Sequence, residues 1–97
     1  MRDAVHELLA TEAAVAKLGA RGITVEEAGR LARNRHVTVK NPSDPVPPGT
    51  RRLLIGVTDG GRTLTLVIQR TLEPTTWLII TGWSSTAAER NLLRTSR

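Results

Sequence analysis

The sequence predicts a single α+β domain, residues 1–97, with two N-terminal helices, an antiparallel sheet of three or four strands and a short C-terminal helix. Three observations predict it. Residues 3–32 carry apolar side chains at helical spacing, and residues 36–81 contain apolar, β-branched runs separated by turn residues. Thr86 and Glu89 then form a Ser/Thr-x-x-Glu helix start. A chain of 97 residues suits one domain with a modest core.

Two helices are expected before the sheet. Residues 3–18 are rich in Ala, Glu and Leu with loosely helical apolar spacing, and Gly19 and Gly22 favour the end of this helix. The segment Thr24-Val25-Glu26-Glu27 is a capping box, which opens a second helix to about Ala32.

The predicted strands lie in the middle of the chain. His36–Lys40 alternates and is β-branched, which favours a short strand. Asn41–Gly49 holds four of the five prolines, so we expect a semi-rigid loop within the domain. Strands are expected at Arg52–Thr58 and Thr63–Arg70, and a central strand at Trp77–Thr81, which is apolar on both faces.

The turn Asp59-Gly60-Gly61-Arg62 predicts a hairpin between two of these strands. If Gly60-Gly61 is a two-residue loop, odd-numbered residues of the strand Arg52–Thr58 lie opposite even-numbered residues of the strand Thr63–Arg70. One face is then wholly apolar and the other is rich in hydroxyls, so we expect the second face to be the functional one. The apolar face would comprise Leu53, Ile55, Val57, Leu64, Leu66 and Ile68.

Composition limits the classes of function. The net charge of +5, with twelve arginines and two lysines, favours polyanions or an acidic partner, since arginine suits bidentate contacts with phosphate. A GC-rich genome would also explain the ratio of arginine to lysine, though not the charge. The absence of cysteine excludes disulfides, and no apolar run is long enough to span a bilayer, so a cytoplasmic protein without membrane contact is expected. Trp77 and Trp83 are the only aromatic residues, which argues against a broad base-stacking surface.

Several polar residues at strand and helix ends are candidates for function. Arg52, Arg62 and Arg70 could bind RNA phosphates or stabilise a scissile phosphate, or could solvate the sheet edge. The segment Trp83–Thr86 before the last helix could bind an anion through backbone amides, or Thr86 could only cap the helix. Glu89 could complete the capping box or accept a proton, and His36 could be a general base or a surface histidine.

Taken together, these segments resemble the BrnT family of toxins from type II toxin–antitoxin modules. The resemblance rests on four segments in the family's order: Ala20–Ala28, Arg51–Gly56, Gly61–Val67, and Ile79–Thr81 through Glu89-Arg90. It covers about residues 15–93, and each motif alone is short. Where the family commonly has an arginine and a basic residue after the last strand, this chain has Trp83 and Ser84.

The resemblance implies a RelE-like fold, a metal-independent endoribonuclease that acts on mRNA without a cofactor, and neutralisation by a DNA-binding antitoxin encoded beside it. The alternative is a non-catalytic basic module that binds an acidic partner or nucleic acid, and the missing arginine at Trp83 favours that alternative. A generic RNA-binding module is a third interpretation, weakened by the few aromatic residues. The residues assigned to catalysis are Arg52, Arg62, Arg70, Thr81, Ser84 and Glu89, and those assigned to RNA binding are Arg21, Arg51, Trp83 and Arg90.

Overall fold

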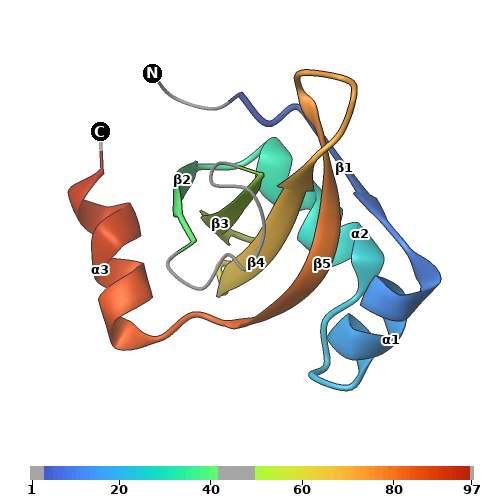
Figure 1. Ribbon diagram of the computed structural model, residues 1–97. Coiled ribbons are helices and arrows are strands. Elements are labelled where there is room, and N and C mark those ends of the chain that lie inside the picture. Colours follow the sequence, from blue (N-terminus) through green and yellow to red (C-terminus); the bar gives the residue numbers. More distant parts are fainter. Residues whose placement is uncertain (1–3, 42–49, 97) are drawn as a thin grey trace.

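The computed structural model of the protein describes residues 4–41 and 50–96. Within these residues a five-stranded sheet has the order β1-β5-β4-β3-β2 (Figure 1). The predicted loop at residues 41–49 lies almost wholly outside the described residues. In chain order the elements are β1 (Glu7–Ala10), α1 (Glu12–Gly19), α2 (Val25–Gly29), the 3-10 turn η1 (Arg30–Ala32), β2 (His36–Lys40), β3 (Arg51–Val57), β4 (Thr63–Arg70), β5 (Thr76–Ser84) and α3 (Ala87–Thr95).

The α+β class is confirmed, but the sheet is mixed rather than wholly antiparallel. β1 pairs with β5 in parallel, and the other neighbours are antiparallel. The predicted helix at residues 3–18 is therefore wrong in its first half. Glu7–Ala10 forms an edge strand along Thr76–Ile79, and α1 begins only after Thr11, whose hydroxyl accepts from the Ala14 amide at 3.1 Å. Pairing with a strand some 70 residues away outweighs a weak local preference for helix.

The hairpin register also differs from the prediction by one residue. Gly61 has φ +90, and its amide donates to the Thr58 carbonyl at 3.0 Å, so the loop has three residues, Asp59 to Gly61. As a result Leu54 pairs with Leu66 and Ile55 with Thr65. The expected face that joined Leu53, Ile55 and Val57 to the even residues of β4 does not exist, because a one-residue shift moves every side chain of a strand to the other face.

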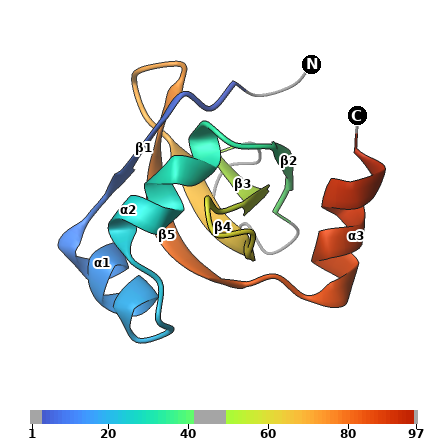
Figure 2. The same ribbon diagram turned by 180° about the vertical axis from the view of Figure 1, so that it is seen from behind.

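The main core lies on the sheet face covered by α1 and α2 (Figure 2). Leu54, Leu66 and Ile68 of the hairpin meet Trp77 and Ile79 of β5 there. The helices complete the cluster with Ala14, Leu18, Ala28 and Leu31. Gly82 of β5 belongs to this face, because an added Cβ would come within 2.6 Å of Leu66 Cδ2 and 3.0 Å of Leu18 Cδ2.

The opposite face carries the odd residues of β3 and β4 and is flanked by α3. Ile55, Val67 and Leu93 are buried but lie outside the main cluster. β5 is central, as predicted, but it runs on to Ser84, and an irregularity between Val67 and Ile68 leaves Ile80 without a partner in β4. Thr86 and Glu89 form the predicted capping box at the start of α3.

Candidate nucleic-acid interface

Half of the ten predicted site residues lie where β5 ends and α3 begins. We call this region the β5–α3 junction and define it by Thr81, Trp83, Ser84, Glu89 and Arg90. Thr81 and Trp83 pair with Val67 and Thr65 of β4, so both belong to the face opposite the main core. Ser84 is exposed, and Trp83 is half-buried.

Among the side chains of the junction, Glu89 accepts the most hydrogen bonds. Its carboxylate accepts hydrogen bonds from the Thr86 amide at 2.8 Å, Thr65 Oγ1 at 2.9 Å and Trp83 Nε1 at 3.0 Å. Burial raises the pKa of the Glu89 carboxyl, but these hydrogen bonds favour the ionised form and together hold the pKa below its ordinary value. Glu89 is therefore an ionised carboxylate and a weak base at neutral pH.

Two hydroxyls outside the set of assigned site residues support Glu89. Thr65 is fully buried and Ser85 nearly so, and their hydroxyl oxygens lie 2.8 Å apart. Because Thr65 Oγ1 donates to Glu89, the Ser85 hydroxyl donates to Thr65. The sequence signals were the position of Thr65 on the hydroxyl-rich face of the hairpin and the place of Ser85 in the Trp83–Thr86 segment, a predicted alternative anion site.

Two arginines border the junction. Arg90 Nη1 donates to the Ser85 carbonyl at 2.7 Å, which holds its guanidinium at the start of α3. Arg21, which follows α1, donates through Nη1 to Thr81 Oγ1 at 3.1 Å and to the Gly82 carbonyl at 2.9 Å. Arg21 thus reaches the edge of β5 from the helical side of the sheet.

The remaining predicted arginines lie elsewhere. Arg51 and Arg52 begin β3 and Arg70 ends β4, at the end of the hairpin away from its turn. Arg51 Nε donates to Gln69 Oε1 at 3.1 Å, and the Arg70 guanidinium lies 4.8 Å from the Trp77 ring centroid. From Arg62 to Arg70, β4 spans roughly 25 Å. Arginines at the two ends therefore cannot clamp one phosphate.

Arg62 lies at the turn end of the hairpin, next to α2. Its Nη2 donates to the Gly22 carbonyl at 3.1 Å and forms an ion pair with Glu27 Oε1 at 3.0 Å. His36 lies at the start of β2, where its Nδ1 is 2.9 Å from the Asn34 carbonyl. Neither side chain belongs to the junction.

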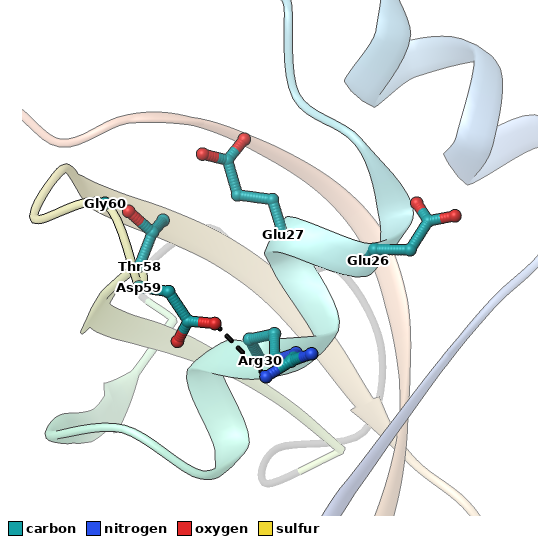
Figure 3. Close-up of a pocket in the computed structure, with 6 residues that line it drawn as sticks. All are labelled: Glu26, Glu27, Arg30, Thr58, Asp59 and Gly60. Carbon is teal, nitrogen blue, oxygen red and sulfur yellow. Dashed lines mark ion pairs between the residues drawn. The ribbon is translucent and has the colours of Figure 1, made fainter.

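A pocket of about 310 Å³ lies between α2 and the hairpin turn (Figure 3). Its charges are already paired in part, since Arg30 Nη1 lies 3.2 Å from Asp59 Oδ2 (Figure 3). Its remaining lining residues are Glu26, Glu27, Thr58 and Gly60. The mixture of charges gives this pocket no preference for a polyanion, and none of the predicted site residues lines it.

In residues 4–41 and 50–96, no three His, Asp or Glu side chains are grouped so that they could hold a metal ion. None of the helices in the same residues has the length and apolar content to cross a bilayer. The sequence matches no model of a known protein family, and it matches no curated protein. The resemblance to BrnT toxins, and the ribonuclease activity that it implies, therefore stay predictions.

Proposed function

We propose that the protein is the toxin of a type II toxin–antitoxin module: a BrnT-like, RelE-like, metal-independent endoribonuclease that acts on mRNA and is neutralised by a DNA-binding antitoxin encoded beside it. The observation that carries the proposal is the β5–α3 junction. Basic, aromatic, hydroxyl and carboxylate side chains from β5, α3 and the end of α1 meet there. The net charge of +5 adds a general attraction for RNA.

In this proposal each group of the junction has a limited task. Arg90 binds the scissile phosphate and stabilises the charge that develops on it. The half-buried Trp83 ring stacks on a neighbouring base, and the exposed Ser84 hydroxyl orients the ribose 2′-hydroxyl. Glu89 fixes the Trp83 indole through the 3.0 Å bond, so it positions the site rather than deprotonates the nucleophile.

A second candidate function is supported by the same carboxylate. With three hydrogen bonds to Glu89 Oε1 and the pKa of the carboxyl lowered, the junction as described offers no strong base for activating a 2′-hydroxyl. A non-catalytic module that binds RNA or an acidic partner with the same basic groups needs no such base.

A cleavage assay on the purified full chain distinguishes the endoribonuclease from the non-catalytic module. We expect single-stranded RNA to be cut with and without EDTA. Arg90→Ala should slow cleavage by about a hundredfold, the usual cost of removing one group that stabilises a transition-state charge. Arg94→Ala is the matched control, because Arg94 is also exposed on α3 but lies one turn further from the junction and should retain the wild-type rate within about twofold.

Equal rates for Arg90→Ala and Arg94→Ala would contradict the assignment of Arg90. Intact RNA in every reaction, with tight RNA binding retained, would favour the non-catalytic module. Expression in cells without the neighbouring gene gives an independent result, because the toxin should arrest growth and the Arg90→Ala protein should not.

A further inference from the structure

A basic cavity of about 400 Å³ lies between the end of α1 and the edge of β5. It is lined by Lys17, Ala20, Arg21 and Thr81. Lys17 and Arg21 are exposed, and Thr81 is half-buried. The cavity therefore combines two positive charges with one hydroxyl and opens to solvent.

The Arg21 guanidinium is fixed in orientation by β5. Both of its hydrogen bonds, to Thr81 Oγ1 and the Gly82 carbonyl, are made by the single nitrogen Nη1. Among the described residues, no acceptor receives a hydrogen bond from Arg21 Nη2 or Nε, so these donors remain for a ligand. Since Thr81 Oγ1 accepts from Arg21, its own proton is also left to donate.

The two positive charges repel each other. Lys17 lies in the last turn of α1, Arg21 follows the C-cap Ala20, and both side chains line this cavity, so their charges are close together. No carboxylate of the described chain pairs with either, whereas Arg30 and Arg62 each have an acidic partner. An anion in the cavity would relieve this repulsion.

We propose that the cavity of Lys17, Arg21 and Thr81 is a second phosphate-binding subsite, which takes a phosphate of the single-stranded RNA bound at the β5–α3 junction. This inference rests on the proposed RNA-binding function and identifies the path that the RNA takes across the protein. Thr81 and Trp83 lie two residues apart on the same face of β5, or roughly 7 Å, which is close to the spacing of neighbouring phosphates in an extended strand. A base stacked on Trp83 therefore brings an adjacent phosphate to Thr81 and Arg21.

Binding is tested separately from cleavage with a labelled 2′-O-methyl RNA oligonucleotide, which lacks the attacking hydroxyl. Anisotropy titrations at several salt concentrations compare the wild-type full chain with Lys17→Ala and Arg21→Ala. We expect each variant to weaken binding by roughly three- to tenfold and to reduce the slope of log K against log salt by about 0.7, the value for one lost phosphate contact with a single strand. Lys40→Ala is the matched control, because Lys40 is the only other lysine and is exposed at the end of β2.

The outcomes distinguish the subsite from the proposed function. RNA that is cleaved normally and bound equally by Lys17→Ala and Lys40→Ala would overturn the subsite alone. Selective weakening by Lys17→Ala with no cleavage of ordinary RNA would support the subsite and remove the ribonuclease. An oligoglutamate that binds through Lys17 and Arg21 as tightly as the RNA would overturn the subsite in favour of an acidic protein partner. Melting temperatures check that Arg21→Ala still folds. Lys17 makes no side-chain hydrogen bond to the described residues, so Lys17→Ala tests the subsite even if Arg21→Ala is destabilised.

Discussion

The Glu89 carboxylate accepts hydrogen bonds from three parts of the chain: Thr65 on β4, Trp83 on β5 and the Thr86 amide before α3. The sequence predicted the Thr86 contact, because a Thr-x-x-Glu spacing has a local meaning at a helix start. It could not predict the other two contacts. They depend on long-range pairing, since Thr65 and Trp83 lie side by side only because β4 and β5 pair in this register.

Replacing Glu89 by Gln tests how much the ionised carboxylate contributes. The folded-state pKa of Glu89 is lowered, so its stabilisation is present above the pKa of the unfolded chain and is lost as the pH falls through the folded-state pKa. We expect Glu89→Gln to lower the free energy of unfolding at pH 7 by roughly 0.5–1.5 kcal/mol, because the amide keeps the cap but loses the charge. In acid the two proteins should converge.

Urea unfolding at a series of pH values measures this difference. Glu73→Gln is the control, since Glu73 lies on an exposed turn and its carboxylate has no hydrogen bond in the described structure. A gap between wild type and Glu89→Gln that stays constant down to the most acid pH would show that the charge of Glu89 is not what stabilises the junction.

At the scale of elements, the structure that depends on local sequence signals could be predicted, whereas the structure that depends on long-range pairing could not. The strands β2, β3 and β4 and the start of α3 follow from period-two alternation and a capping box, and they lie within a residue or two of their predicted limits. β1 could not be predicted, because Glu7–Ala10 is a strand only through its parallel pairing with β5. The hairpin register was missed for a related reason: the two glycines allow either a two-residue or a three-residue loop.

The two glycines of the three-residue loop have different backbone conformations. Gly61 has φ +90, a conformation that residues with a Cβ rarely adopt, while Gly60 has a negative φ and an added Cβ there would meet only Thr58 Oγ1, at an ordinary 3.9 Å. We expect Gly61→Ala to lower the free energy of unfolding by about 1–2 kcal/mol and Gly60→Ala to leave it nearly unchanged. Chemical denaturation of both variants measures this. Equal costs at the two positions would argue against the three-residue loop and the register that follows from it.

At the scale of the whole molecule, the two faces of the sheet are stabilised in different ways. One face has a continuous apolar core with α1 and α2. The other face relies on α3, which has Leu93 as its one buried residue and polar contacts at both ends. At its start are the capping box and Glu89. At its end Arg35 Nη2 donates to the Leu93 carbonyl at 2.8 Å and approaches the Arg94 and Ser96 carbonyls at 3.4 and 3.3 Å.

Because so little apolar surface holds α3, we expect it to open locally before the rest of the domain unfolds. Arg35→Ala removes the cation that binds its last carbonyls, so amide exchange in α3 should become about fivefold faster, a cost of about 1 kcal/mol, while amides of β4 stay unchanged. Hydrogen exchange with residue resolution measures both sets. Arg33→Ala is the control, since Arg33 is exposed two residues earlier and makes no side-chain hydrogen bond to the described residues. If exchange quickened equally in α3 and β4, α3 would unfold only with the whole domain, and the β5–α3 junction would be as rigid as the core.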